Sequence, residues 1–410
     1  MLVNFSKNPI IYVTRDLERA LGLPLETKGY FIISNYSAFA KKRIGARKNV
    51  FLVKGKGVLD TRELLDLPQV KKFINKIKKP NIVVFKNTIQ IEEICQKNGW
   101  KLLNPPAKLS NMIEEKISQI EWLGELAKFL PPYRIMECGQ IKWLGKKFVL
   151  QFNRAHTGSG TVLIESEQQL KEIQDKFVKR PVRVMEYISG PVLTNNNVVW
   201  GKKVLIGNIS YQITGLKPFT DRPFATVGND WALPYKILTR KQLKEYNQIA
   251  QAIGKRMAQS GWQGLFGIDV IWEEKTGKLY LIEINARQPA SATFESILQR
   301  EKDKSGLTIF KAHLLALLGG KYNREKLVVI KNGAQIVQKV VPIEKSIDEK
   351  LLDYNVRKFK KDGWDIFLYN NTELEKDWIR MQSSIGIMEA HNKINHQGTK
   401  ATLFVSKLFF

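Results

Sequence analysis

Three oxygen-bearing side chains in the middle of the chain are the ones best suited to chemistry: Asp269, Glu283 and Asn285. The two apolar segments that contain them, 264–274 and 278–287, are separated by a short turn and are typical of a β-hairpin. A hairpin register places Asp269 directly opposite Glu283, and Asn285, two residues further on, points to the same face. Carboxylate and amide oxygens suit Mg²⁺, which keeps several waters and is usually bound by a few protein ligands together with substrate phosphates.

The turn of this hairpin sets the register on which the metal site depends. Lys275-Thr276-Gly277 predicts a three-residue turn that pairs Glu274 with Lys278. An alternative is that Asp269 and Glu283 are solvated residues on an exposed strand face. We favour the metal site, because both lie in strongly apolar runs and charged residues are rarely buried unless they are paired or bind a metal.

Length and composition describe an ordinary soluble protein. A chain of 410 residues predicts two or three domains, and 43% hydrophobic with 26% charged residues is a globular composition. The sequence contains no run of 18 apolar residues, so no membrane span is expected, and the first residues lack a signal-peptide pattern. The two cysteines, Cys95 and Cys138, form neither a metal-binding spacing nor a disulfide framework, so we expect a cytoplasmic protein.

The net charge of +27 is concentrated near the N-terminus. Residues 1–110 carry 21 Lys and Arg against 8 Asp and Glu, with the densest runs at 41–48 and 71–79. Such a surface could attract nucleic acid or an anionic substrate. We favour solvated helix faces and no nucleic-acid partner, because no nucleic-acid-binding signature accompanies the charge.

Strands and helices alternate over residues 1–108, which predicts a parallel, Rossmann-like sheet. No G-x-G-x-x-G follows a strand, so a dinucleotide site is not indicated, and Asn104-Pro105-Pro106 marks a domain boundary. The expected strands are 29–35, 49–53 and 81–85, and the expected helices are 64–77 and 88–98.

The next part of the chain predicts a helix over 109–130, capped by Ser110 and ended by Pro131-Pro132. From residue 321 the apolar pattern weakens, and we expect the tail, 401–410, to pack on the preceding domain. The elements expected between them are strands 133–137, 147–153, 162–164, 183–188, 197–200 and 203–212, and helices 167–177 and 239–259.

A loop rich in glycine and hydroxyl groups joins two of these strands: Thr157, Gly158, Ser159, Gly160 and Thr161. Glycines let backbone N–H groups turn toward an anion, and the hydroxyl groups add donors. A plain hairpin turn is the alternative, and the sequence does not match a P-loop. The loop gains weight from the apolar strand end at 185–188, where backbone groups could pair with a base edge, and from the acidic hairpin 80 residues later.

This order of parts resembles the ATP-grasp superfamily of carboxylate–amine ligases over about residues 30–320. The most specific element is Gly267-Ile-Asp269 followed by Glu283-Ile-Asn285-Ala-Arg287. The resemblance implies an α/β fold, in which a Rossmann-like pre-ATP-grasp domain precedes an ATP-grasp fold of two α+β subdomains. The implied divisions are the N-terminal domain 1–108, a small subdomain 109–190 with a lysine-bearing helix and the glycine loop, a metal-binding subdomain 191–320, and a C-terminal extension 321–410.

The resemblance also implies roles for individual residues. Asp269, Glu283 and Asn285 would hold one or two Mg²⁺, for which Mn²⁺ could substitute, and Arg287 would stabilise the transferring phosphoryl group or acyl-phosphate. The implied ATP contacts are Lys116 to the phosphates, Gln151 and the glycine loop Thr157–Thr161, and Glu186, Tyr187 and Ile188 to adenine. Lys116 could instead be a solvated helix lysine, and Tyr187 a core residue.

Two positions depart from the family's pattern. Gln151 stands where many members have a lysine, and a glutamine can donate to a phosphate but brings no charge. Arg154 or His156 could compensate for it. The acidic residue that often contacts ribose is absent from 189–194. Both departures favour a diverged subfamily, while the complete metal set argues against an inactive protein.

The acceptor substrate is expected to contact a polar segment between the hinge strand and the acidic hairpin. Gln212, Lys217 and Arg222 are the candidate anion contacts, and Lys217 and Arg222 are candidate catalytic residues. A surface loop is the alternative reading of this segment.

The sequence therefore predicts an ATP- and Mg²⁺-dependent ligase that activates a small-molecule carboxylate as an acyl-phosphate and couples it to an amine. A biotin-carboxylase-like activity ranks lower, because the chain has no carrier domain. The third alternative is a diverged ATP-grasp protein with a nucleotide- or nucleic-acid-binding role and no ligase activity. No membrane partner is expected, and a homodimer is compatible with the sequence.

Overall fold

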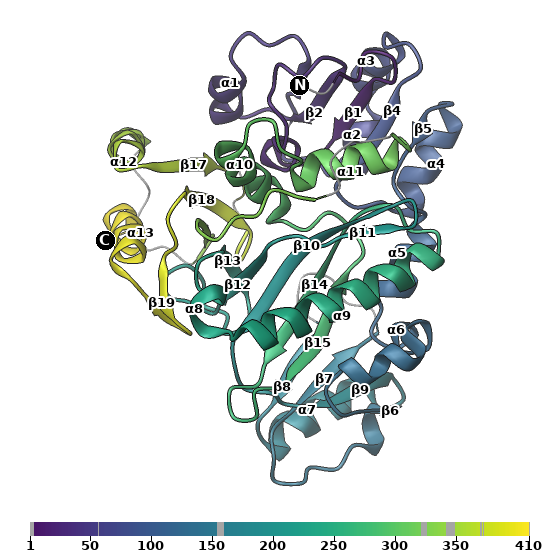
Figure 1. Cartoon of the computed structure of the whole chain (residues 1–410), viewed down its shortest axis with the longest axis vertical. Coiled ribbons are helices and arrows are strands. Elements are labelled where there is room, and N and C mark those ends of the chain that lie inside the picture. Colours follow the sequence, from purple (N-terminus) through teal and green to yellow (C-terminus); the bar gives the residue numbers. More distant parts are fainter. Residues whose placement is uncertain are drawn as a thin grey trace.

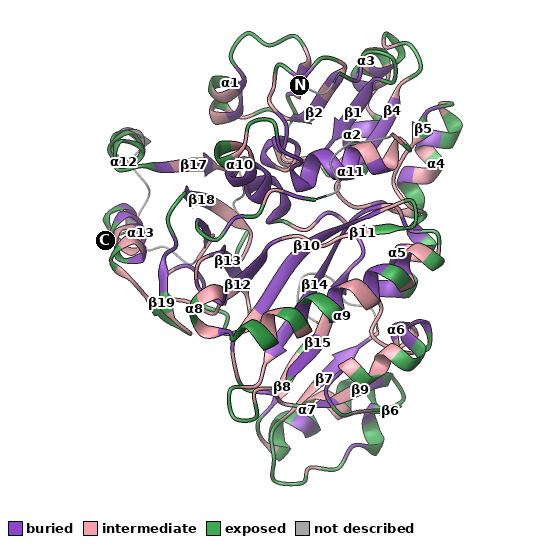
Figure 2. Cartoon of the chain, viewed as in Figure 1, coloured by how far each residue is buried: buried purple, intermediate pink, exposed green. Residues whose placement is uncertain are grey.

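The structure is a computed structural model that describes residues 4–55, 57–153, 160–320, 326–341, 349–369, 371 and 373–409. Three of the four sheets in the described residues lie one after another along the long axis of the molecule, with the N-terminal sheet at one end and a small four-stranded sheet at the other (Figure 1). The fourth is the two-stranded pair β19-β20. A large antiparallel sheet lies between them, and its strands are buried along most of their length (Figure 2).

The N-terminal sheet has five parallel strands in the order β3-β2-β1-β4-β5, which confirms the Rossmann-like expectation. Apolar clusters fill both of its faces, as expected for a parallel sheet covered on both sides. Its elements are β1 Ile10–Val13, η1 Leu17–Ala20, β2 Tyr30–Asn35, α1 Ala38–Ile44, β3 Val50–Val53, α2 Thr61–Asp66, α3 Pro68–Asn75, β4 Asn81–Val84, α4 Ile89–Lys97 and β5 Lys101–Leu102.

The helix expected over 64–77 is wrong in one respect, since the structure has two helices, α2 and α3, there. Leu67 separates them with an extended backbone, φ −66° and ψ 134°. The residue before a proline is pushed out of the α region, and Pro68 begins α3 as its first residue.

The helix expected over 109–130 is also broken. It consists of α5 Ala107–Glu114, α6 Ser118–Leu123 and the 3₁₀ helix η2 Gly124–Phe129. Ser110 does not cap a helix, because it lies inside α5 and its hydroxyl donates to the Ala286 carbonyl at 3.1 Å. Lys116 therefore lies in the break between α5 and α6 rather than on a helix.

The small sheet has the antiparallel order β6-β9-β7-β8 and is covered by α7, which Ser166 caps at its N-terminus. Its strands and the helix agree closely with the expected ranges. Its elements are β6 Tyr133–Glu137, η3 Cys138–Gln140, β7 Phe148–Phe152, β8 Thr161–Ile164, α7 Glu167–Phe177 and β9 Pro181–Glu186.

The large sheet runs in the order β15-β14-β10-β12-β13-β16-β18-β17, with β11 paired to β10. The long helix α9 crosses its front (Figure 1), where a capping box of Thr239 and Gln242 starts the helix and residues from Tyr246 to Met257 form its buried stripe. The elements up to residue 317 are β10 Val192–Trp200, β11 Lys203–Leu205, β12 Ile209–Thr214, β13 Thr226–Asp230, α8 Pro234–Ile237, α9 Arg240–Gln259, β14 Gly264–Trp272, β15 Leu279–Asn285, α10 Ala292–Lys302 and α11 Ile309–Leu317.

The single strand expected over 203–212 is two strands, β11 and β12. Gly207 lies between them, so close to β10 that a Cβ atom there would be 1.7 Å from the Asn196 carbonyl oxygen. The chain must bend at this point, and only a residue without a side chain fits.

The C-terminal residues extend the large sheet. Strands β16, β18 and β17 continue it beyond β13, and side chains of α13, among them Phe404 and Val405, pack into its main core, as expected of the tail. Within the described ranges, no helix is long and apolar enough to cross a membrane. The elements are β16 Ala334–Lys339, α12 Glu349–Lys361, β17 Trp364–Leu368, β18 Asp377–Ser383, β19 Met388–Ala390, β20 Lys393–Ile394 and α13 His396–Phe409.

Candidate active site

The acidic hairpin has the predicted pairing at its functional residues. Asp269 lies directly opposite Glu283, and Asn285, which pairs with Gly267, points to the same face. The Asn285 side-chain nitrogen lies 3.4 Å from Asp269 Oδ2, so the amide and the carboxylate are in contact. The three predicted metal ligands are therefore brought together.

The turn of the hairpin differs from the prediction. Glu273, not Glu274, bonds to Lys278 through its backbone N–H, so the turn has one residue more than expected. The register shifts by one between Asp269 and Val270, which pairs with Leu281. This β-bulge at Ile282 restores the pairing of Asp269 with Glu283 despite the longer turn.

Burial makes this carboxylate pair costly without a cation. Asp269 and Asn285 are only 5% and 8% exposed, whereas 45% of the Glu283 side chain is exposed. Burial, together with the charge of Glu283, raises the pKa of Asp269 to about 7. In the described part of the chain no cluster of three or more His, Cys, Asp or Glu residues could hold a metal, so a site here relies on the Asn285 amide oxygen. Two carboxylates and an amide fit Mg²⁺.

Lys116 completes the charge balance on one side of the hairpin. Its ammonium lies 2.9 Å from Glu283 Oε1. Burial alone would raise the pKa of Glu283, but Lys116 and Arg287 lower it. The helix break that carries Lys116 is held by Asn153 at the end of β7, whose side-chain oxygen accepts from the Ile117 N–H at 2.8 Å.

Arg287 follows β15 and is held by a residue that the sequence did not single out for the site. Its guanidinium pairs with Glu114 of α5, and the other Glu114 oxygen pairs with Lys86 of the N-terminal domain at 2.7 Å. Burial would raise the pKa of Glu114, but Arg287 and Lys86 lower it. Glu114 and Arg287 are 173 positions apart, so no local pattern predicts this pair.

Gln151 lies beside a second residue that sequence reasoning missed. It is directly opposite Arg183 on the neighbouring strand β9, and its side-chain oxygen accepts from two guanidinium nitrogens at 2.9 and 2.6 Å. Arg183 is fully buried. Burial lowers the pKa of Arg183 to about 10, and the charge of Glu283 opposes that shift.

The glycine loop is described only at its end. Thr157, Gly158 and Ser159 lie outside the described residues, as do Arg154 and His156. The Gly160 carbonyl accepts from the Phe152 N–H at 2.8 Å, and Thr161 begins β8 opposite Gln151. The two ends of the loop are therefore joined by the β7–β8 pairing.

The expected adenine contacts lie where the small and large sheets meet. Glu186 ends β9 and is exposed, and the Tyr187 ring lies 4.2 Å from the Lys147 ammonium. Ile188 is buried against Ile271 of β14. This hinge therefore follows the strand that carries Arg183 and packs against the strand that carries Asp269.

Lys217 and Arg222 lie on the loop after β12 and are exposed. Arg222 is 4.0 Å from Glu375 of the C-terminal residues, and Gln212 donates to Thr226. In the described ranges, no hydrogen bond or ion pair joins Lys217 or Arg222 to the acidic hairpin. Their catalytic roles remain predictions, because no described contact places Lys217 or Arg222 at the acidic hairpin.

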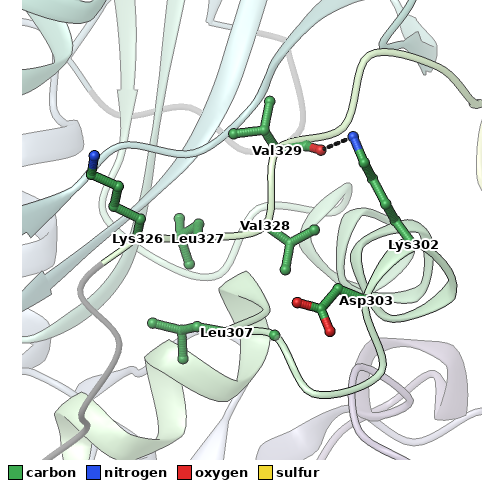
Figure 3. Close-up of a pocket in the computed structure, with 8 residues that line it drawn as sticks. Lys302, Asp303, Leu307, Lys326, Leu327, Val328 and Val329 are labelled. Atoms are coloured by element: carbon green, nitrogen blue, oxygen red, sulfur yellow. Dashed lines mark hydrogen bonds between the residues drawn. The ribbon is translucent and has the colours of Figure 1, made fainter.

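A separate pocket of about 410 Å³ opens between α10 and the segment 326–329. Lys302 donates to the Val329 carbonyl at its edge, and Asp303 lies across from Val328 (Figure 3). None of the predicted site residues lines this pocket, so it is not part of the site described above.

The comparisons with known proteins agree with the order of these parts. The family model described as an ATP-grasp domain matches residues 113–291. That range contains Lys116, Gln151, the hinge and the whole acidic hairpin. Residues 113–291 are therefore similar to an ATP-grasp domain.

Solved structures match nearly the whole chain and show its fold. Carboxyaminoimidazole ribonucleotide synthase from Aspergillus clavatus, complexed with ATP, is similar with a TM-score of 0.64 at 15% identity, over 98% of both chains. N5-carboxyaminoimidazole synthetase from Staphylococcus aureus, complexed with ADP, gives 0.63 at 14% identity over 99% of both chains. An L-amino acid ligase from Bacillus licheniformis gives 0.60 at 14% identity, over 97% of this chain and 96% of that one. No curated protein matches the sequence.

Proposed function

We propose that this protein is an ATP-dependent carboxylate–amine ligase that uses Mg²⁺ and releases ADP and phosphate. The observation that carries the proposal is the meeting of Asp269, Glu283 and Asn285 with Lys116 and Arg287 on one face of the acidic hairpin. Phosphoryl transfer requires carboxylate oxygens that bind a metal cation and basic side chains that contact the phosphate oxygens. Its catalysis is mostly positioning and charge neutralisation.

In the proposed reaction, an oxygen of the substrate carboxylate attacks the γ-phosphorus of ATP and the bond to ADP breaks. The amine then attacks the acyl carbon, and phosphate leaves. Asp269, Glu283 and Asn285 would hold Mg²⁺, which when bound neutralises charge on the phosphate oxygens. Lys116 would contact the phosphates, and Arg287, fixed by Glu114, would stabilise the transferring phosphoryl group.

The class of substrate is a small carboxylate together with an amine. The similar structures are named for ribonucleotide and amino acid substrates, so they differ in what they join. A cytoplasmic setting fits the two cysteines, which are both free and buried.

The test is ADP release and product mass after incubation with ATP, Mg²⁺ and a panel of amino acids and other carboxylates and amines. We expect Glu283→Ala to lower substrate-stimulated ADP release by roughly a hundredfold or more, because one charged ligand of the phosphate-binding face is lost. Glu274→Ala, at an exposed position of the same hairpin, should behave as the wild type. Near wild-type turnover by Glu283→Ala would show that the metal assignment is wrong.

A further inference from the structure

Arg183 is a buried cation whose bonded partners are all neutral. Its side chain is 0% exposed. Two of its nitrogens donate to the Gln151 oxygen, and the third donates to the Gln119 oxygen at 3.2 Å. Over the described residues, the guanidinium of Arg183 forms no ion pair with a carboxylate. The charge of Glu283 acts on Arg183 without a direct contact. A buried charge that no carboxylate contacts directly is costly, so the site favours an anion nearby.

The place where an anion would fit follows from the strand pairing. Arg183 on β9 lies opposite Gln151 on β7, and Gln151 lies opposite Thr161 on β8. Thr161 is the last residue of the glycine loop. Strand β7, which carries Gln151, therefore lies between Arg183 and Thr161.

Arg183 also fixes the direction of the Gln151 amide. Because two guanidinium nitrogens occupy the Gln151 oxygen, the amide cannot turn over without losing both bonds. Its NH₂ group is then directed toward β8, where it donates to the Thr161 hydroxyl at 3.2 Å. Gln119 is held in the same way, since its own NH₂ group donates to the Ile113 carbonyl at 2.7 Å.

We propose that Arg183 is a positioning residue for the nucleotide, which supplies positive charge to the ATP polyphosphate across Gln151 and holds the Gln151 amide as a donor. This inference rests on the proposed function and deepens it, because it names Arg183 of β9 as the source of the charge that Gln151, on the strand before the glycine loop, does not bring. Gln151 and Arg183 act as one unit, in which the amide lies on β7 and the cation lies on the neighbouring strand β9.

The experiment is calorimetric titration of the full chain with Mg²⁺ and ADP, which needs no substrate and no turnover. We expect Arg183→Gln to weaken ADP binding by about tenfold or more, since a charge-assisted contribution to phosphate binding is lost. The double variant Gln151→Lys with Arg183→Gln moves the cation from β9 to β7. It should return the ADP affinity to within about threefold of the wild type. Arg183→Lys keeps the charge but loses the forked contact with the Gln151 oxygen, so its ADP affinity should lie between those of Arg183→Gln and the wild type.

The matched control is Arg134→Gln, which removes an exposed cation from β6, the other neighbour of β9. It should leave ADP affinity unchanged, and thermal melting should show that each variant is folded. The inference is overturned if folded Arg183→Gln binds ADP like the wild type, or if neither Arg183→Lys nor the double variant binds more tightly than Arg183→Gln. If the wild type itself does not bind ADP, the proposed function fails instead.

Discussion

Individual side chains of the site are held by partners from distant parts of the chain. Arg287 is the clearest case, because Glu114 from α5 holds it and Lys86 from the N-terminal domain holds Glu114. The position of Arg287 is thus set by a chain of three charged residues. A guanidinium that must meet a transferring phosphoryl group gains from such fixing, since misplacement by about 1 Å can cost roughly a hundredfold in rate.

Replacing Glu114 should therefore affect the rate more than nucleotide binding. We expect Glu114→Gln to lower kcat by roughly ten- to a hundredfold, because Arg287 loses the charge that orients it. ADP affinity, measured by calorimetry, should stay within about threefold. Glu121→Gln, on the exposed face of α6, is the control for kinetics. An unchanged kcat in Glu114→Gln would contradict the role given to this pair.

The acidic residues were predictable from sequence, whereas their partners were not. Asp269, Glu283 and Asn285 follow from a period of two in neighbouring apolar segments, which is local information. Arg183 and Glu114 give no local signal, because their partners come from other strands and helices. Gln151 was singled out as a departure, and the described charge beside it comes from Arg183 of β9. Arg154 and His156 lie outside the described residues.

Among the secondary-structure elements, the break between α5 and α6 bears most directly on the proposed site, because it carries Lys116. Asn153 stabilises it by accepting from the Ile117 N–H and by donating to the Glu115 carboxylate at 3.1 Å. The break turns Lys116 toward Glu283, which a continuous helix over 109–130 would not do. Strand β7 thus carries Gln151, and Asn153, the residue directly after the strand, positions Lys116.

Asn153→Ala should lower the free energy of unfolding by about 1 to 2 kcal/mol, since a backbone N–H and a carboxylate lose their partner. It should also weaken ADP binding, because Lys116 is no longer held. Urea denaturation and calorimetry measure the two effects. Gln168→Ala, an exposed residue of α7, should change stability by less than about 0.5 kcal/mol. Wild-type stability together with wild-type affinity in Asn153→Ala would count against this account.

Elements with strong local signals were predicted well. Helices α7 and α9 have capping residues and regular apolar stripes, and both were placed within one residue of their observed ends. The breaks were missed where tertiary contacts decide the backbone, as at Lys116 and at Gly207 beside Asn196. The bulge at Ile282 was missed for the same reason, because the strand sequence does not show which residue is left unpaired.

At the scale of the whole molecule, the N-terminal domain and the C-terminal strands meet in a largely buried cluster of charges. Asp377 of β18 pairs with Lys339 at 2.6 Å, with Arg380 at 3.0 Å and with Arg19 of the N-terminal domain at 3.6 Å. Burial would raise the pKa of Asp377, but these three cations hold it well below its usual range. The C-terminal residues are thus part of the sheet and part of the contact that places the N-terminal domain.

Asp377→Asn should destabilise the fold by about 3 kcal/mol at pH 7, because the buried Arg380 and the partly buried Arg19 and Lys339 lose their shared anion. A carboxylate with a depressed folded pKa stabilises the protein above its unfolded pKa, and this contribution is lost as pH falls. The difference between the wild type and Asp377→Asn should therefore narrow below about pH 4. Urea denaturation at pH 7 and at lower pH measures it, with the exposed Asp362→Asn as control. A difference that does not depend on pH would contradict the assignment.

The central claim is that a substrate carboxylate is activated by direct attack on ATP, and isotope transfer tests it most directly. The wild type is incubated with ATP, Mg²⁺, the amine and a substrate whose carboxylate is labelled with ¹⁸O, and the inorganic phosphate is analysed by mass spectrometry. An acyl-phosphate pathway predicts that one labelled oxygen appears in each phosphate released. Formation of the coupled product with unlabelled phosphate would contradict the mechanism.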